Sequence, residues 1–236
     1  SGLPSGDSFD IDYVAHEMGH QLGGNHSFTH GYEGTIAQVE PGSGSTIMGY
    51  AGITSYDVQA HSDAIFAYKN IYQIQTNLAT KTCLSSVTMT NNTPIVDAGL
   101  DYTIPKGTPF ILTGSATDAD ATDVLTYTWE QNDLGSSTTT TTSSRVLATK
   151  TTGPTFRIFP PSTSPVRFLP ELSRVINATQ TVTVSANTYW ETVSTVARPL
   201  NFTLTARDNQ VLAGQTGTDA MLVTVSGTTG PFVVTS

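Results

Sequence analysis

Apolar residues recur at helical spacing in one clear segment near the N-terminus. Residues 61–78 place Ala64, Ala67, Ile71, Ile74 and Leu78 at steps of three and four, which predicts an amphipathic helix. Ser62 is a plausible N-cap, and the Asp63 carboxylate suits the positive first turn of a helix. A shorter helix is predicted over residues 10–22. The glycine-rich residues 27–45 are predicted to form a loop.

From residue 93 onward the apolar positions alternate with a period of two. This alternation, with turn residues between the runs, predicts an antiparallel β-sandwich with Trp129 in its core. The clearest runs are Leu125/Tyr127/Trp129, Leu200/Phe202/Leu204/Ala206, Phe110/Leu112 and Met221/Val223/Val225. Residues 131–194 exceed what a minimal sandwich needs, so we predict a large insertion or extra hairpin with a mobile Ser/Thr-rich tip. Trp190 within it is expected to pack in a core.

These patterns divide the chain into two parts of different fold. Residues 1–83 form the first part, 84–93 a linker, 94–228 the sandwich with its insertion, and 229–236 a connector to a further module. The predicted fold class is therefore α+β and multidomain, with a mainly helical part followed by an antiparallel sandwich.

Charge and composition exclude some classes of partner. The 236 residues contain 10 Lys and Arg against 19 Asp and Glu, without a basic run, which disfavours nucleic acid and anionic membranes. No apolar run approaches the roughly 20 residues of a membrane span. Abundant Thr, Ser, Gly and Asn with few charges are typical of extracellular β-rich proteins. Cys83 is the single cysteine, so we expect either a buried small side chain or a bond to a cysteine elsewhere.

The segment HEMGHQLGGNH, residues 16–26, carries the strongest chemical signal. His16 and His20 share one helix face, and a turn at Gly23 can bring back His26 as a third ligand. Three neutral imidazoles leave the fourth tetrahedral position of Zn²⁺ open for water, and Glu17 can accept the proton of that water. This extended pattern is far more specific than HExxH alone. His30 and His61 are predicted to be surface or capping residues.

The motif is followed by SGSTIMGYAGI, which carries Met48 and Tyr50. Together these segments resemble the metzincin clan of zinc endopeptidases, in particular the reprolysin-like metallopeptidases of Gram-negative bacteria. The resemblance implies that residues 1–83 are the mainly helical C-terminal part of a catalytic domain and that Met48 forms a hydrophobic floor under the zinc. It also implies that Tyr50 is a weak extra ligand or a donor to the oxyanion. Animal reprolysins have Asp after the third His, where this chain has Ser27.

The same resemblance implies a secreted enzyme from a Gram-negative bacterium that acts on protein or peptide substrates. Only residues 1–13 precede the motif region, so the N-terminal, sheet-bearing half of the catalytic domain is expected on a longer parent polypeptide. The stretch beginning PIVDAGLDYTIPKG resembles bacterial immunoglobulin-like or PKD-like modules.

Two functions follow as alternatives. The first is a secreted zinc endopeptidase that hydrolyses peptide bonds with metal-activated water and Glu17 as general base. The second is a non-catalytic extracellular binding or adhesion module with a structural or vestigial zinc site. Separately, the carboxylates of Asp118, Asp120, Asp123 and Asp208 could ligate Ca²⁺, or could cap local turns.

Overall fold

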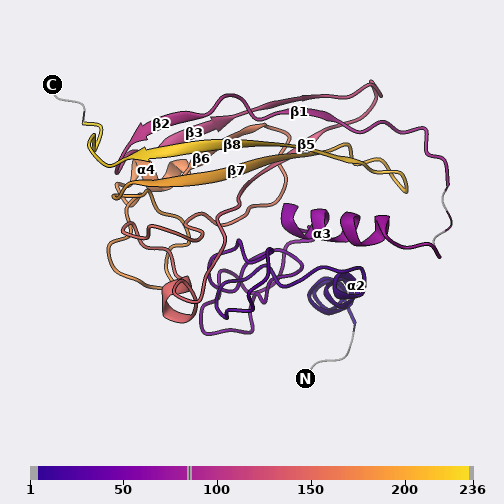
Figure 1. The fold of residues 1–236 in the computed structure, drawn as a ribbon, viewed down its shortest axis with the longest axis horizontal. Coiled ribbons are helices and arrows are strands. Elements are labelled where there is room, and N and C mark those ends of the chain that lie inside the picture. Colours follow the sequence, from indigo (N-terminus) through magenta and orange to yellow (C-terminus); the bar gives the residue numbers. More distant parts are fainter. Residues whose placement is uncertain (1–4, 84, 86, 234–236) are drawn as a thin grey trace.

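The computed structural model describes residues 5–83, 85 and 87–233, and it shows a helical, loop-rich part packed beneath a β-rich part (Figure 1). Residues 1–4 of the predicted first part, 84 and 86 of the predicted linker, and 234–236 of the predicted connector lie outside the described residues. The helical elements are α1 (Asp7–Phe9), a π-helical segment η1 (Asp10–Ala15), α2 (His16–Gln21), α3 (Tyr68–Ala79), a 3₁₀ turn η2 (Thr141–Ser144) and α4 (Leu172–Ile176). The strands are β1 (Ile95–Asp97), β2 (Tyr102–Pro105), β3 (Phe110–Thr113), β4 (Ser115–Thr117), β5 (Thr126–Gln131), β6 (Val166–Leu169), β7 (Arg198–Arg207) and β8 (Thr216–Ser226).

The first helix runs without a break through α1, η1 and α2, so it begins three residues before the predicted position 10. It ends at Gln21, and Gly23, two residues on, has φ +105° and donates its N–H to the His20 carbonyl at 3.0 Å. That left-handed conformation favours glycine. A Cβ at Gly23 would also lie 2.8 Å from the Asn77 side chain of α3. The chain therefore reverses here and passes close under α3.

The second helix begins at Tyr68, so its predicted start at residue 61, with Ser62 as N-cap, is wrong. Residues 62–66 instead run beside the loop that precedes Met48. The Asp63 N–H bonds the Ser45 carbonyl at 2.7 Å, and the Ile47 N–H bonds the Ile65 carbonyl at 2.9 Å. These tertiary bonds take the backbone groups that another helical turn would need. Among the described residues, no helix combines the length and apolar character needed to cross a bilayer.

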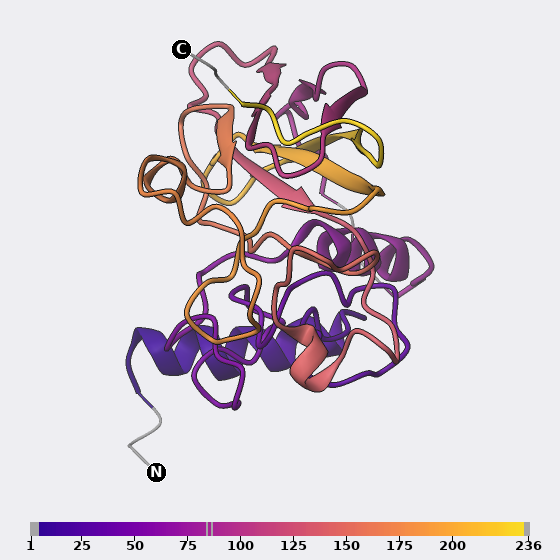
Figure 2. The same ribbon diagram turned by 90° about the vertical axis from the view of Figure 1, so that its left-hand side faces the viewer.

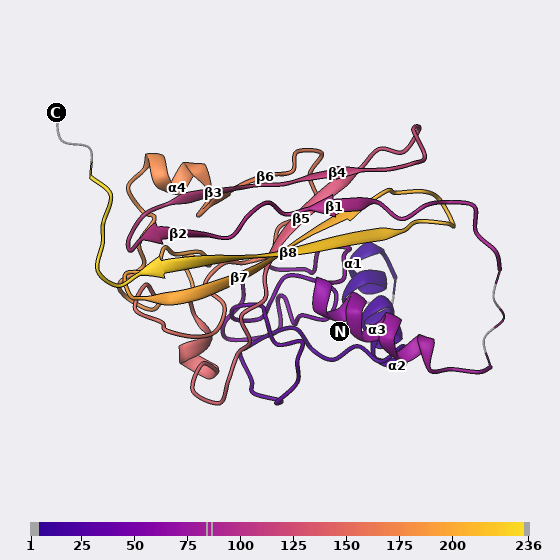
Figure 3. The same ribbon diagram turned by 45° about the horizontal axis from the view of Figure 1, so that its top comes forward.

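The β-rich part has a four-stranded sheet in the order β2-β8-β7-β5, with the β3–β6 and β1–β4 pairs beside it (Figure 3). The prediction of purely antiparallel strands is wrong for β2, which pairs with β8 in parallel. One face of the large sheet packs against β3 and β6, as the alternation predicts. This core contains Ala98, Phe110, Leu112, Trp129, Phe156, Leu169, Leu200, Phe202, Leu204, Met221, Val223 and Val225.

The opposite face of the sheet is polar and meets the first part of the chain. Glu130 of β5 is fully buried, and its Oε2 accepts the N–H of Tyr68 at the start of α3 at 2.7 Å. Arg207 of β7 donates to the Phe66 carbonyl at 3.3 Å and to Thr128 Oγ1 at 2.9 Å. The two parts are thus joined by hydrogen bonds across the start of α3.

Residues 131–194 do not form an extra hairpin, and the mobility of their Ser/Thr-rich tip stays a prediction. They supply β6 and α4, and they pack along the loop that follows the first helix (Figure 2). Hydrogen bonds join Gly135 N–H to the Gln38 carbonyl at 2.7 Å and Thr141 N–H to the His30 carbonyl at 3.0 Å. A small core of Val146, Val182 and Trp190, with Tyr56 and Val58 packed against it, closes the same contact. Residues 131–194 therefore cover one side of this loop.

The buried Glu130 makes the stability of the protein depend on pH. Burial raises the pKa of Glu130 from 4.5 to about 7, although Arg207 and the Tyr68 N–H oppose that shift. An acid whose pKa is higher in the folded state loses stability as pH rises from 4.5 through 7. Glu130→Gln should therefore leave the free energy of unfolding nearly unchanged at pH 4.5 and increase it by up to about 3 kcal/mol at pH 8. Urea unfolding at both pH values measures this difference.

The exposed Glu171 provides the matched control for this experiment. Glu171→Gln removes a carboxylate on the protein surface, so it reports the effect of a Glu→Gln change outside the core at both pH values. A Glu130→Gln variant that is less stable than the parent at pH 8 would contradict the interpretation.

Candidate metal centre

The side chains of His16, His20 and His26 are each fixed through Nδ1. His16 Nδ1 donates to the Ile47 carbonyl at 2.7 Å, and His20 Nδ1 donates to the Gly24 carbonyl at 2.8 Å. His26 Nδ1 donates to Glu33 Oε1 at 2.7 Å. Carbonyl and carboxylate oxygens only accept hydrogen bonds, so Nδ1 of each ring is the protonated nitrogen. A neutral ring in this tautomer presents its lone pair at Nε2, as a metal ligand does.

These ligand atoms converge on one point. The potential ligand atoms of the three histidines lie within 4.8 Å of one another, and Nε2 of His20 lies 3.1 Å from Nε2 of His26. Two lone pairs at this separation repel unless a cation lies between them. Tetrahedral zinc holds its nitrogen ligands about 3.4 Å apart, so the site fits Zn²⁺. Burial lowers the pKa of His16, which further favours its neutral, ligating form.

Met48 is fully buried and lies against α2 between two of these histidines. A Cβ added at Gly19 would lie 2.4 Å from Met48 Sδ and 2.9 Å from the Phe66 ring. Only glycine leaves room for this contact, so the methionine thioether packs directly on the helix backbone. The role of Met48 as a floor under the metal stays a prediction.

Tyr50 lies beside two of the three histidines, His16 and His26. Its ring centroid is 4.6 Å from that of His26 and 5.5 Å from that of His16. Burial raises the pKa of Tyr50, with further contributions from the Glu33 and Glu17 carboxylates, so its phenol is a hydrogen-bond donor at neutral pH. The structure thus brings Tyr50 within the site, although it holds no hydrogen bond that assigns its role.

The two remaining histidines occupy different environments. His30 is half-buried. Its ring lies 4.0 Å from that of Phe28, and burial lowers its pKa. His61 is exposed, and its Nδ1 lies 2.8 Å from Asp12 Oδ2. Neither belongs to the convergent group.

Glu17 is exposed in the first turn of α2 and faces a cleft of about 630 Å³. His16 and Tyr50 line the same cleft, as do the apolar side chains of Phe9 and Ile53. A carboxylate, an imidazole ligand and a phenol therefore meet at one solvent-accessible surface. Such a set can bind a metal, move a proton and donate a hydrogen bond.

Two carboxylates that support the site could not be found from sequence spacing. Glu33 orients His26, as described above. Glu40 is fully buried and accepts hydrogen bonds from Ser27 Oγ at 2.6 Å, from Ser45 N–H at 2.8 Å and from Thr46 Oγ1. Glu40 thereby ties the residue that follows His26 to the residues that precede Met48. Ser27, which stands where the animal reprolysins have Asp, thus donates a hydrogen bond to the Glu40 carboxylate.

The acidic residues of the β-rich part lie apart from the histidines. Asp118, Asp120 and Asp123 form a second group whose oxygens lie within 4.8 Å of one another. Asp208 does not join it, because its carboxylate accepts bonds from Asn91 Nδ2 at 2.5 Å and from Gln215 N–H at 2.9 Å. Asp118 caps the Asp120 N–H at 2.9 Å, as a turn residue does. The calcium site stays a prediction.

Cys83 is exposed, which is not the buried position expected for a small apolar side chain.

Removal of the Glu33 carboxylate should weaken metal binding. A carboxylate that accepts from a ligating imidazole fixes the ring and raises its basicity, and its loss costs about 10- to 100-fold in metal affinity. We expect Glu33→Ala to raise the dissociation constant of Zn²⁺ by this factor, and Glu33→Gln by less, because the amide oxygen still accepts from Nδ1. Competition with a chromophoric zinc chelator measures both, with Glu171→Gln as the remote control. An unchanged affinity in Glu33→Ala would show that His26 needs no such partner.

Comparison with known families gives one match. Residues 1–80 match the family model described as metallo-peptidase family M12B, reprolysin-like. No curated protein matches the chain. The matched segment contains the three histidines, Glu17, Met48 and Tyr50. Residues 1–80 are thus similar to the reprolysin-like metallopeptidases, zinc-dependent hydrolases of proteins or peptides, and the match supports a metallopeptidase.

Proposed function

We propose that this chain carries the zinc-binding part of a secreted endopeptidase that hydrolyses internal peptide bonds. The observation that supports this most directly is the convergence of three imidazole lone pairs beside an exposed glutamate. His20 and His26 bring Nε2 atoms within 3.1 Å, and Glu17 lines the cleft that opens next to His16. A structural zinc site would close its fourth position with a protein ligand, whereas an open position facing a cleft suits catalysis.

The residues of the chain divide the reaction between them. His16, His20 and His26 would hold Zn²⁺, which supplies Lewis acidity that makes water acidic and polarises the peptide carbonyl. Glu17 takes a proton from the attacking water, whose oxygen forms a bond to the carbonyl carbon. The C–N bond then breaks, and Glu17 delivers the proton to the leaving amine. The products are a carboxylate and an amine.

Tyr50 is suited to stabilise the negative charge that develops on the carbonyl oxygen. Its phenol lies beside His16 and His26 and lines the same cleft as Glu17. A donor held in place before the reaction stabilises the oxyanion without reorganisation. We therefore assign Tyr50 the role of a hydrogen-bond donor to the substrate.

The residues that line the cleft indicate which kind of substrate side chain binds next to Glu17. Phe9, Tyr13 and Ile53 line it beyond the catalytic side chains. The pocket volume of about 630 Å³ is large enough for a peptide segment with one bulky side chain. An apolar residue of the substrate fits this surface best.

Replacement of Glu17 tests the proposal directly. Glu17→Ala should retain one Zn²⁺ per chain and lose at least about 100-fold in cleavage of a denatured protein substrate, since general acid–base catalysis contributes at least that factor. Metal analysis and a protease assay on the same preparation measure both quantities, and Glu171→Gln serves as the control. Full proteolysis by the zinc-loaded variant would contradict the proposal.

Replacement of Tyr50 separates its catalytic role from packing. Tyr50→Phe keeps the ring against His26 and removes only the donor. We expect kcat to fall about 10-fold or more, as for a lost hydrogen bond to a charged group, with KM and zinc content nearly unchanged. A reduced zinc content with unchanged kcat would assign Tyr50 to metal binding instead.

A further inference from the structure

A second cavity, distant in sequence from the histidine motif, lies within residues 138–185 of the β-rich part. It has a volume of about 350 Å³. Eight of its eleven lining residues are serine or threonine, and the others are Arg145, Leu147 and Lys150. The cavity therefore combines many hydroxyl groups with two cationic side chains. No acidic side chain contributes to the described lining.

Lys150 lines this cavity, and few acceptors compensate the charge of its ammonium group. Its Nζ donates to the carbonyls of Arg145 at 3.3 Å and Pro154 at 3.4 Å, which are long bonds for an ammonium group. It forms no ion pair with any carboxylate of the residues that the structure describes. One of its three N–H donors is left without a protein acceptor in that region. An anion in the cavity would supply the missing partner.

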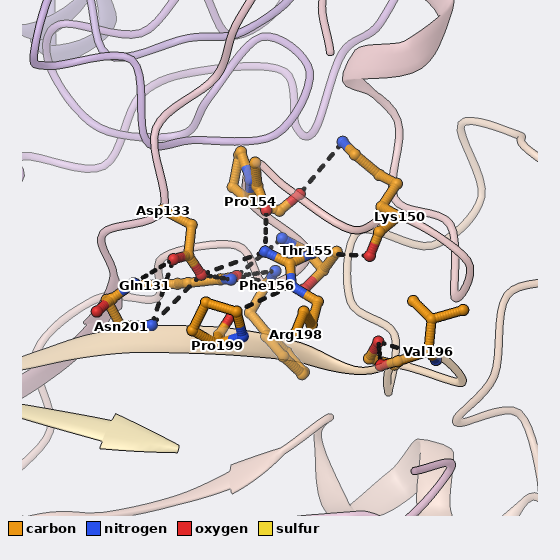
Figure 4. A network of polar contacts seen from close by, with 12 residues as sticks. Gln131, Asp133, Lys150, Pro154, Thr155, Phe156, Val196, Arg198, Pro199 and Asn201 are labelled. Atoms are coloured by element: carbon orange, nitrogen blue, oxygen red, sulfur yellow. Dashed lines mark hydrogen bonds and ion pairs between the residues drawn. The ribbon is translucent and has the colours of Figure 1, made fainter. Parts of the chain in front are cut away.

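Asp133, which belongs to the same network of polar contacts, is already committed to other donors (Figure 4). Asp133 pairs with Arg198 at 3.3 Å and accepts from Asn201 Nδ2 at 2.6 Å and from Gln131. Arg198 in turn donates to the carbonyls of Gly153 at 2.7 Å and Lys150 at 3.2 Å. The charge of Asp133 is thus balanced by Arg198, and Arg198 adds positive charge near Lys150.

Burial, and secondarily Arg198, lower the pKa of Lys150 to about 7. A structural lysine with this environment is costly, because an isolated buried charge is disfavoured relative to an apolar side chain of similar shape. The chain carries only 10 cationic residues against 19 acidic ones, and two of the cations line this one cavity. A negatively charged ligand in the cavity would compensate the charge of Lys150.

We propose that this cavity binds the oxyanion group of a small ligand, a carboxylate or a sulfate, at Lys150 with the threonine hydroxyls as further donors. A hydroxyl-lined wall suits a ligand that is itself polyhydroxylated, such as an acidic monosaccharide. A volume of about 350 Å³ accommodates one such unit and not a peptide segment. This site is independent of the zinc centre and of its proposed reaction.

Titration of the whole chain with defined anions tests the proposal. Amide signals of Thr151 and Thr152 in ¹H–¹⁵N correlation spectra should shift saturably with millimolar glucuronate or sulfate at constant ionic strength. Glucose, which has the same hydroxyl groups and no charge, should not shift them. Saturation by glucuronate assigns the ligand to acidic sugars, whereas saturation by sulfate alone assigns it to sulfate groups. No saturable shift with either anion would overturn the proposal.

Lys150→Met tests how much the ammonium charge of Lys150 contributes to anion binding. Methionine keeps the apolar stem, so the variant should fold, and its dissociation constant for the anion should rise at least about 10-fold. Lys81→Met, at an exposed lysine outside the lining, should bind as the parent chain does. Lys150→Gln provides a second neutral variant if the methionine side chain disturbs the spectrum. Unchanged affinity in the neutral variants would show that Lys150 takes no part.

Discussion

The direction of three imidazole rings depends on the hydrogen bond that each makes through Nδ1. One acceptor, the Gly24 carbonyl, belongs to the turn after α2. The other two, the Ile47 carbonyl and Glu33, lie in residues 27–60, which have almost no regular secondary structure. The positions of the three imidazole rings therefore depend on the conformation of this loop, because the loop holds hydrogen-bond acceptors of the rings. The buried Gln38 fixes the loop, since its amide joins Glu33 N–H to the carbonyls of Phe28 and Gly31.

The β-rich part completes this support from the other side. Ser45 Oγ donates to the Ile158 carbonyl at 3.1 Å, and Gly42, at φ +56°, packs so tightly that a Cβ would lie 2.5 Å from the Trp190 ring. A buried polar group that loses such a partner costs about 1–3 kcal/mol. Several of these contacts together decide whether the loop keeps its shape. Residues 131–194 therefore pack against the loop that carries the outer hydrogen-bond partners of the histidines.

Local patterns predicted the elements that rest on local physics. The four-residue spacing of His16 and His20 fixed them on one helix face, and the alternation around Trp129 and Phe202 placed both in the β core. Pairings over long sequence distances left no such pattern. The parallel β2–β8 pair and the bonds that shorten α3 depend on segments that no periodicity connects. Glu33 and Glu40 are single acids in a loop, and only their burial and partners show what they do.

α3 also carries a polar face, which the apolar stripe in the sequence did not indicate. Asn70, Gln73 and Asn77 recur at helical spacing and bond the turn that leads into His26: Asn77 Nδ2 donates to the Leu22 carbonyl at 2.7 Å, and Asn70 Nδ2 to the Asn25 carbonyl at 2.7 Å. The first N–H of the same helix bonds Glu130 of the sheet. One helix of 12 residues, α3, thus contacts both the β-sheet, at Glu130, and the turn that precedes the third histidine.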